Sequence, residues 1–306
     1  MMRRAALAGA LAAGLSVAAA AAQVYRGGTD LVLLSVTVTD GAGRHVPGLQ
    51  REDFRIYEDG VPQEIAHFSS QPEPISLSLL IDTSTSMEME RKLTLAQQAA
   101  SGFVSRLGPG DVAQIIDFDS QTKILAPFTG DKAELDRALR LTKAGGSTSL
   151  YNAIYTSLSE LRRLRGQSGR EARRQAIVLL SDGEDTASLV SDEQVLELAK
   201  KSEINIYAIS LRPNRASDRQ RQAFSQAEYL VNALTRETGG RAFFPSSIGE
   251  LESVYERIAE ELRTLYSVGY VSSNARRDGK WRRIVVRVPD REGITVRHKL
   301  GYYAPR

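Results

Sequence analysis

The sequence predicts an α/β protein in which a doubly wound, mainly parallel sheet is inserted into a small β-sandwich built from both ends of the chain. Residues 75–81 (ISLSLLI) are almost uninterruptedly apolar, as in a strand buried on both faces of a parallel sheet. From there to about residue 265, apolar runs of strand length alternate with helical patterns, which favours βαβ units. Before and after this region the strand period is two, which is typical of half-buried strands.

The N-terminus resembles an export signal. Arg3 and Arg4 precede an Ala/Leu-rich run over residues 5–17, and residues 20–22 offer an A-x-A-type cleavage site. We therefore expect a signal peptide over residues 1–22 and an exported protein, either periplasmic or secreted. The apolar run is short and rich in alanine, so no membrane span is expected in the mature chain, although an uncleaved anchor is the alternative.

Composition excludes several classes of protein. The 306 residues include 42% hydrophobic and 25% charged residues, as in a soluble chain with a substantial core. The net charge of +3 is small, which argues against nucleic acid as the main partner. The chain has no cysteine, so a disulfide framework and a lipoprotein anchor are both excluded.

The segment over residues 23–72 is expected to supply strands to the sandwich. The expected strands are residues 32–38, 54–58 and 63–68. Because three strands alone bury little apolar surface, they need a partner sheet. Glu58 and Asp59 offer two carboxylates that could hold a cation, but Asp59-Gly60 is more typical of a hairpin turn.

Residues 73–265 are predicted to form the α/β domain. The expected strands are residues 75–81, 111–118, 123–128, 176–181, 204–211 and 241–244, of which 123–128 is an antiparallel edge strand. The expected helices are residues 93–107, 131–141, 151–163, 225–238 and 248–265. The arginine-rich stretch that ends at Arg174 is expected to be a solvated loop. The last helix carries one apolar stripe, made by Leu251, Val254, Tyr255, Ile258 and Leu262.

Residues 266–306 are expected to complete the sandwich. The expected strands are residues 266–271, 281–288 and 294–300, separated by Asp-Gly and Glu-Gly turns. Trp281, Tyr302 and Tyr303 could form a binding face, but packing is the commoner use of such side chains.

Oxygen-bearing side chains follow the first strand of the α/β domain. Asp82, Ser84 and Ser86 lie at the carboxyl end of that strand, where open α/β sheets bind their ligands. These hard oxygen donors suit Mg²⁺, and the absence of softer ligands nearby argues against zinc or copper. Asp and Ser after a strand are also typical of turns and helix caps, so this pattern alone does not establish a metal site.

Two further stretches favour the metal site. Gly145-Gly146-Ser147-Thr148-Ser149 opens a helical run, and Asp182 follows a second apolar strand. The order D-x-S-x-S, G-G-x-T and S-D-G resembles the metal-ion-dependent adhesion site of von Willebrand factor A (VWA) domains. The resemblance covers about residues 74–265. It implies that a divalent cation is held by Asp82, Ser84, Ser86, Thr148 and Asp182.

The resemblance also implies a function. The cation would be Mg²⁺, or Mn²⁺ or Ca²⁺, and a protein partner would complete its coordination with an Asp or Glu carboxylate. Asn152 departs from the aspartate that the family usually has after the threonine motif. The opening over residues 38–54 and the ending over residues 279–304 resemble an exported bacterial family described as VWFA-related.

Other functions remain as alternatives. One is a scaffold subunit of a cell-envelope assembly, with a structural or vestigial metal site. Another is a metal-dependent hydrolase. A phosphatase of the haloacid-dehalogenase type needs a second Asp where this chain has Ser84, whose hydroxyl holds its proton too tightly for proton transfer. The three histidines have no metal-binding spacing, so we predict no catalytic residues and no enzyme.

Overall fold

The computed structural model describes residues 31–167, 173–211 and 226–306. The expected signal peptide over residues 1–22 lies outside these residues. In the part of the chain that the structure describes, no helix is both long and apolar enough to span a membrane.

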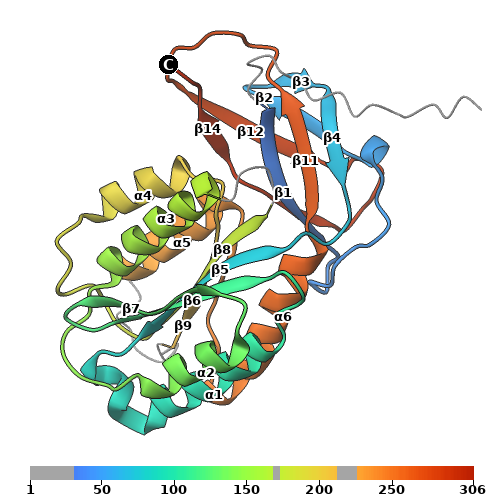
Figure 1. Cartoon of the computed structure of the whole chain (residues 1–306). Helices are drawn as coiled ribbons and strands as arrows, with labels where there is room; N and C mark the ends of the chain where they lie inside the picture. Colours follow the sequence, from blue (N-terminus) through green and yellow to red (C-terminus); the bar gives the residue numbers. More distant parts are fainter. Residues whose placement is uncertain (1–30, 168–172, 212–225) are drawn as a thin grey trace, which may run out of the picture. The chain divides into compact units, whose positions relative to one another are not determined.

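A six-stranded sheet forms the centre of the α/β region, in the order β10-β9-β8-β5-β6-β7 (Figure 1). Its strands are β5 (Ile75–Asp82), β6 (Val112–Phe118), β7 (Thr122–Thr129), β8 (Arg174–Ser181), β9 (Asn205–Ser210) and β10 (Arg241–Phe243). All neighbours pair in parallel except β7, which runs antiparallel to β6 at the edge. The predicted fold class and the predicted antiparallel edge strand are confirmed.

Helices cover both faces of this sheet. They are α1 (Lys92–Ser105), α2 (Lys132–Leu141), α3 (Leu150–Gln167), α4 (Asp192–Lys200), α5 (Gln226–Thr238) and α6 (Leu251–Thr264). Helices α1, α2 and α6 share one buried cluster with the sheet, and α3, α4 and α5 share a second one (Figure 1). Within β5, Leu79 belongs to the first cluster and Leu80 to the second, so the strand is buried on both faces as predicted.

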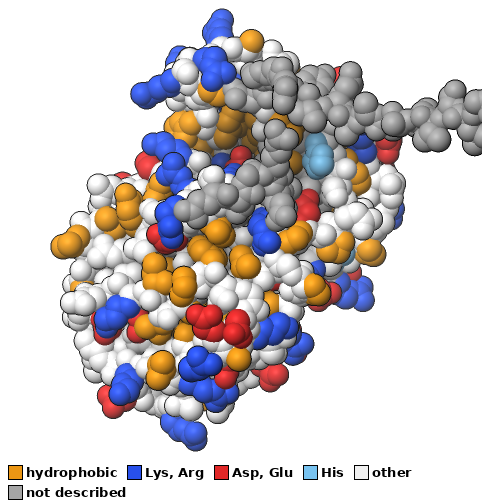
Figure 2. Space-filling view, in the orientation of Figure 1, with side chains coloured by type: hydrophobic (Ala, Val, Ile, Leu, Met, Phe, Trp, Pro, Cys, Tyr) orange, Lys and Arg blue, Asp and Glu red, His pale blue; other side chains and the backbone are white. Residues whose placement is uncertain are grey.

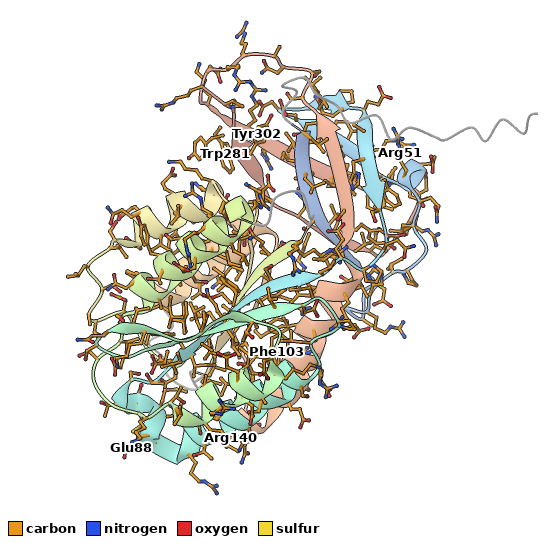
Figure 3. All side chains as sticks on the ribbon, in the orientation of Figure 1. Arg51, Glu88, Phe103, Arg140, Trp281 and Tyr302 are labelled. Carbon is orange, nitrogen blue, oxygen red and sulfur yellow. The ribbon has the colours of Figure 1, made fainter. Side chains whose placement is uncertain are left out.

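Helix α6, the last helix of the α/β region, packs against the sheet through the apolar stripe that the sequence predicts. All five stripe residues of α6 are buried in the first cluster. Phe103 of α1 points into the same layer, and the centroid of its ring lies 5.0 Å from that of Tyr255 (Figure 3). The helical period alone was sufficient to place this helix.

Helix α4 was not predicted. Its start is a capping box, in which the Gln194 backbone N–H donates to Ser191 Oγ at 3.3 Å and the Ser191 N–H donates to Gln194 Oε1 at 2.9 Å. A Ser followed three residues later by Gln, just before an apolar run, is the sequence signature of such a start. The missed helix was therefore visible in the sequence.

Asp131 caps helix α2. The sequence placed this residue in the first turn, but in the structure it precedes the helix and its Oδ1 accepts from the N–H groups of Ala133 and Glu134, at 2.9 and 3.2 Å. We expect Asp131→Ala to lower the free energy of unfolding by about 1 kcal/mol, because two N–H groups lose their acceptor. Urea denaturation would measure the change. Arg137→Ala, on an exposed position of α2, is the control and should change it by less than about 0.5 kcal/mol.

Strands from the two ends of the chain form two further antiparallel sheets. They are β1 (Leu31–Thr39), β2 (Arg55–Glu58), β3 (Val61–Gln63), β4 (Ile65–Ser69), β11 (Tyr266–Val271), β12 (Trp281–Arg287), β13 (Thr295–Arg297) and β14 (Gly301–Tyr303). The orders are β13-β1-β11-β4 and β14-β12-β2-β3. The two sheets share one buried apolar cluster, which holds Val36 of β1, Ile56 of β2, Val268 of β11 and Val286 of β12. The predicted boundaries at residues 72 and 265 stay predictions, since residues 31–306 form one unit.

Two short strands were not predicted, and each lies directly beside one that was. Strand β4 matches the expected strand over residues 63–68 and β13 lies within the expected 294–300, but β3 ends at residue 63 and β14 begins at residue 301, and each belongs to the other antiparallel sheet. Strand β3 pairs with β2, whereas β4 pairs with β11; likewise β13 pairs with β1, whereas β14 pairs with β12. A period of two identifies extended chain but not its sheet, and chains that change sheets make the corners of such packings.

Arg174 is buried, contrary to the expectation from its charged surroundings. It was expected in a solvated loop, but it begins β8 and its side chain is buried. Its guanidinium donates to the backbone carbonyls of Leu262 and Leu265 at 2.9 and 2.6 Å. These carbonyls end α6 and have no partner within the helix, so a cation is stabilised there.

The aromatic residues near the C-terminus are engaged in packing. The centroids of the Trp281 and Tyr303 rings lie 5.0 Å apart, edge to face, and the Tyr303 hydroxyl donates to Glu197 of α4. Lys200 of α4 lies over the Trp281 ring. Figure 3 labels Trp281 beside Tyr302. The packing interpretation of these aromatics is therefore favoured over a free binding face.

Candidate metal centre

The two predicted carboxylates emerge at the same edge of the central sheet. Asp82 is the last residue of β5, and Asp182 follows the last residue of β8. Because β5 and β8 are adjacent parallel strands, with Ile81 opposite Leu180, their carboxyl ends lie side by side. A pair of carboxylates at this edge is what the sequence predicted.

Backbone hydrogen bonds connect this edge to the loop that precedes α3. The Gly145 N–H donates to Thr83 O at 2.8 Å, which joins that loop to the D-x-S-x-S segment. The carbonyl of Thr148 accepts from the N–H groups of Thr186 and Ala187, at 2.9 and 3.0 Å. The segments that carry Asp82, Thr148 and Asp182 therefore hold one another in place.

Four of the predicted site residues are linked by short polar contacts. Ser86 Oγ donates to Asp182 Oδ1 at 2.6 Å and lies 3.1 Å from Ser84 Oγ. Asp82 Oδ1 accepts from the backbone N–H of Ser84 at 2.8 Å. Asp82 Oδ2 accepts from Ser181 Oγ at 2.5 Å, a contact for which the sequence analysis assigned no role. The polar oxygens converge, as a cation site requires.

Gly183 leaves space between Thr148 and Asp82. A Cβ atom on Gly183 would lie 3.2 Å from Thr148 Oγ1 and 3.7 Å from Asp82 Oδ2. Both oxygens therefore face the same small volume, which a side chain on residue 183 would enter. Thr148 is thereby placed with the other four residues, and the glycine of the S-D-G motif has a physical reason.

The electrostatics of the site are dominated by burial. Asp82 is fully buried and Asp182 is 9% exposed. Burial raises the pKa of the Asp82 carboxyl, hydrogen bonds from Ser181 and Ser84 lower it, and the charge of Asp182 raises it. Two carboxylates withdrawn from water are stabilised by a positive charge between or beside them.

Lys92 brings one such charge, which was not predicted from the sequence. Its Nζ lies 2.5 Å from Asp182 Oδ2, and its side chain is only 13% exposed. The two preceding residues, Glu90 and Arg91, have φ angles of +53° and +58°. This left-handed region is rarely adopted by residues other than glycine, so the approach to α1 is conformationally costly. The place of Lys92 in the sequence does not indicate that its ammonium group contacts Asp182.

Asn152 has a structural role. Its Oδ1 accepts from the backbone N–H groups of Leu189 and Val190 at 3.1 and 3.3 Å, which fastens the loop after β8 to helix α3. An amide oxygen meets these donors as well as a carboxylate would. The departure from the family pattern at this position therefore leaves the predicted ligands in place.

The donor set fits a hard divalent cation. Asp82 and Asp182 offer carboxylates, and Ser84, Ser86 and Thr148 offer hydroxyls, which are ligands for Mg²⁺, Mn²⁺ or Ca²⁺. Among the residues that the structure describes, no group of three or more His, Cys, Asp or Glu side chains could hold a metal ion. A cation here would depend on the hydroxyls as well as the two carboxylates.

A parallel sheet between two helical layers, with a D-x-S-x-S loop at its carboxyl edge, defines a von Willebrand factor type A domain. A sequence model described as "von Willebrand factor type A domain" matches residues 77–184. The chain therefore contains a VWA domain.

Curated relatives share part of this chain. A "UPF0353 protein" of Mycolicibacterium paratuberculosis is 29% identical over 199 residues, which are 61% of this chain and 60% of the relative. A "UPF0353 protein" of Mycobacterium leprae is 24% identical over 227 residues, or 69% of this chain and 65% of the relative. The matches thus span about two thirds or less of each relative.

Solved structures support the fold. The "von Willebrand factor type A from Catenulispora acidiphila" has a TM-score of 0.52 at 10% identity and covers 92% of this chain and 76% of that one. Proximal thread matrix protein 1 from the mussel byssus has a TM-score of 0.52 at 17% identity and covers 67% of this chain and 51% of that one. At these identities the likeness concerns the fold alone.

Proposed function

We propose that the protein is an exported, cation-dependent protein-binding module. Mg²⁺, or Mn²⁺ or Ca²⁺, is held by Asp82, Ser84, Ser86, Thr148 and Asp182, and an Asp or Glu carboxylate of the partner completes the site. The observation that carries this proposal is the convergence of these oxygen donors at the carboxyl edge of the sheet, around the space that Gly183 leaves open.

The charge of the donor set suits carboxylate binding. The two aspartates supply at most two negative charges, and the other ligands are neutral, so a bound divalent cation attracts a further anion. Ser86 and Ser181 orient the carboxylates of Asp182 and Asp82 through hydrogen bonds of 2.6 and 2.5 Å. The chain thus contributes five of the oxygen-bearing side chains, and the partner's carboxylate completes the coordination sphere.

Export and the nature of the partner are parts of the same proposal. Export is supported by the basic, Ala/Leu-rich segment over residues 1–22. On the face shown in Figure 2, basic, acidic and hydrophobic side chains are interspersed. Such a mixture favours a protein partner over nucleic acid, which needs a basic patch or stripe.

Titration calorimetry of Mg²⁺ and Mn²⁺ tests the metal site. The wild-type protein should show saturable binding, and Asp82→Ala should abolish it because a charged ligand is lost. Asp111→Asn is a matched control, since Asp111 is also a buried aspartate but accepts from the Ile75 N–H at the opposite end of β5. Its affinity for Mg²⁺ should equal that of the wild type.

A partner capture tests the binding function. Immobilised wild-type protein should retain an envelope protein in Mg²⁺ and release it in chelator, and Asp82→Ala should retain none. If folded Asp82→Ala keeps the partner with unchanged affinity, the proposed mechanism is wrong. Circular dichroism of the variant would establish that it is folded.

A scaffold with a structural site is the second candidate. The Lys92–Asp182 ion pair favours it, because an internal ammonium already supplies positive charge to the buried carboxylates. A single dominant partner that co-purifies equally well with and without chelator would support the scaffold over the cation-dependent module.

A further inference from the structure

A cleft lined by none of the proposed metal ligands contains several arginines. It has a volume of about 650 Å³ and lies among α5, β10 and the segment that contains β13. Arg236, Arg241 and Arg297 line it, together with the aromatic residues Tyr229 and Phe244. The residues lining it in the described part of the chain include no Asp or Glu. A volume of this size is typical of sites for small ligands.

One of the three arginines is neutralised within the protein. Arg297 donates to Glu261 Oε2 at 2.5 Å and to Gly240 O at 2.7 Å. Glu261 Oε1 accepts in turn from the Tyr207 hydroxyl at 2.8 Å. The Arg297–Glu261 ion pair is therefore a neutral part of the wall of the cleft. Both carboxylate oxygens of Glu261 already accept hydrogen bonds from Arg297 and Tyr207.

The other two arginines, Arg236 and Arg241, bring two further cations to the wall of the cleft. Neither Arg236 nor Arg241 forms an ion pair with a carboxylate in the described ranges. The guanidinium of Arg241 lies 5.0 Å from the centroid of Phe243, and that of Arg257 lies 5.2 Å from the same ring. Burial lowers the pKa of Arg241 most, the charge of Arg297 lowers it further, the charge of Glu261 raises it and that of Arg257 lowers it, so Glu261 offsets only part of the repulsion among these cations. A bound anion relieves that repulsion.

The floor of the cleft is tightly built and neutral. A Cβ on Gly240 would lie 1.9 Å from Ile206 O, and one on Gly239 would lie 2.6 Å from the backbone of His298. His298 Nε2 accepts from the Val286 N–H at 3.0 Å and Nδ1 donates to Lys299 O at 2.7 Å, so the ring is neutral. The arginines are therefore the groups that can recognise charge.

The rim offers apolar surface. Tyr229 is 67% exposed and Phe244 is 46% exposed, although large aromatic side chains are usually more deeply buried. Both line the same cleft as Arg236 and Arg241. Aromatic surface beside guanidinium groups suits a ligand with an apolar body and an anionic group.

We propose that this cleft binds a small organic anion, in which a phosphate or carboxylate group on an aromatic or aliphatic body contacts Arg241 and Arg236. The planar guanidinium group can donate two parallel hydrogen bonds to a phosphate or to a carboxylate, so the same arginines can recognise either group. Tyr229 and Phe244 cover the apolar body. This site is independent of the proposed cation-dependent function.

Binding of phenyl phosphate, benzoate, inorganic phosphate and phenol, measured by titration calorimetry, tests the proposal. Phenyl phosphate or benzoate should bind saturably, at least tenfold more tightly than inorganic phosphate or phenol. Arg241→Gln should weaken binding at least tenfold. Arg236→Gln, at an exposed position where folding is not at risk, should weaken it severalfold. Arg283→Gln, on an exposed position of β12 outside the cleft, is the control and should leave binding unchanged.

Three outcomes would overturn the proposal. The first is that neither phenyl phosphate nor benzoate binds saturably. The second is that Arg236→Gln, Arg241→Gln and the wild type bind these anions equally well. The third is that an acidic hexapeptide binds at the same arginines more tightly than phenyl phosphate does. The last result would identify a protein segment as the occupant. A comparison of phenyl phosphate with benzoate decides which oxyanion is preferred.

Discussion

Replacing Arg282 with methionine is expected to lower the free energy of unfolding by about 3–5 kcal/mol, because it leaves the buried carboxylate of Glu58 without its cation. Arg282 Nη1 lies 3.2 Å from Glu58 Oε1, and the two side chains are 4% and 2% exposed. Removing one partner of such a pair costs far more than the pair itself contributes.

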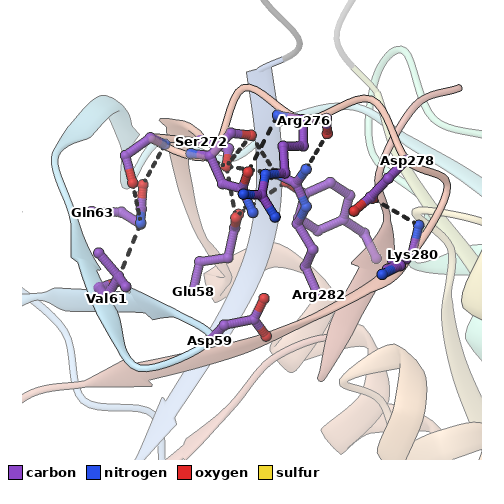
Figure 4. A network of polar contacts seen from close by, with 12 residues as sticks. Glu58, Asp59, Val61, Gln63, Ser272, Arg276, Asp278, Lys280 and Arg282 are labelled. Carbon is purple, nitrogen blue, oxygen red and sulfur yellow. Dashed lines mark hydrogen bonds and ion pairs between the residues drawn. The ribbon is translucent and has the colours of Figure 1, made fainter.

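Hydrogen bonds from several residues hold the carboxylate of Glu58 in the interior. Figure 4 shows Glu58, Ser272 and Arg282 at the centre of a set of polar contacts. Glu58 accepts from the hydroxyls of Tyr270, Ser272 and Tyr302 at 2.8, 2.6 and 2.9 Å. These residues come from both ends of the chain, so the network joins the two antiparallel sheets.

The turn after Glu58 is the predicted Asp59-Gly60 hairpin, in which both residues have positive φ.

Urea denaturation of the variants checks this prediction. Arg283→Met is the matched control, since this neighbour on β12 is exposed and should change stability by less than about 0.5 kcal/mol. Glu58→Gln combined with Arg282→Met removes both charges and should be more stable than Arg282→Met alone. Equal stability of the two would show that the uncompensated charge is not the cause.

Replacing Lys92 with methionine is expected to tighten Mg²⁺ binding about thirtyfold. The Lys92 ammonium lies 2.5 Å from Asp182 Oδ2, where it competes with a divalent cation for the same carboxylate. Two unit charges about 4 Å apart repel by about 1 kcal/mol even in water, and a divalent ion doubles this to about 2 kcal/mol. Because the side chain is 13% exposed, screening by solvent is weak and the effect can be larger.

Calorimetry with the two proteins side by side measures this effect. Lys132→Met is the matched control, because Lys132 begins α2 as Lys92 begins α1, and its Mg²⁺ affinity should equal that of the wild type. Weaker binding by Lys92→Met would mean that the lysine positions Asp182 rather than competes for it. Absence of binding by both the wild type and Lys92→Met would contradict the metal site itself.

Much of the candidate site could be predicted because it follows from chain order. Asp82 ends β5 and Asp182 directly follows β8, and parallel strands present their carboxyl ends at one edge of the sheet. The G-G-S-T loop opens α3 at the same edge, so Thr148 joins them. Their roles as metal ligands remain a prediction that the Mg²⁺ titration will decide.

Long charged side chains could not be placed in the same way. Lys92 and Arg174 sit in polar stretches that look solvated, yet one contacts Asp182 and the other the end of α6. Their partners lie 90 and 88 residues away along the chain, and only folding brings them near. Local sequence records the charge of such a residue but not its partner.

The sequence by itself determined the buried strand β5, the alternation of strands and helices around it and the oxygen donors at the strand ends. These depend on apolar period and on residues that are neighbours along the chain. Only the tertiary structure decided which antiparallel sheet β4 and β14 join, where Lys92 points, and that Glu58 is buried with Arg282. These features depend on contacts between distant segments, and a period of two or a single charge is compatible with several such contacts.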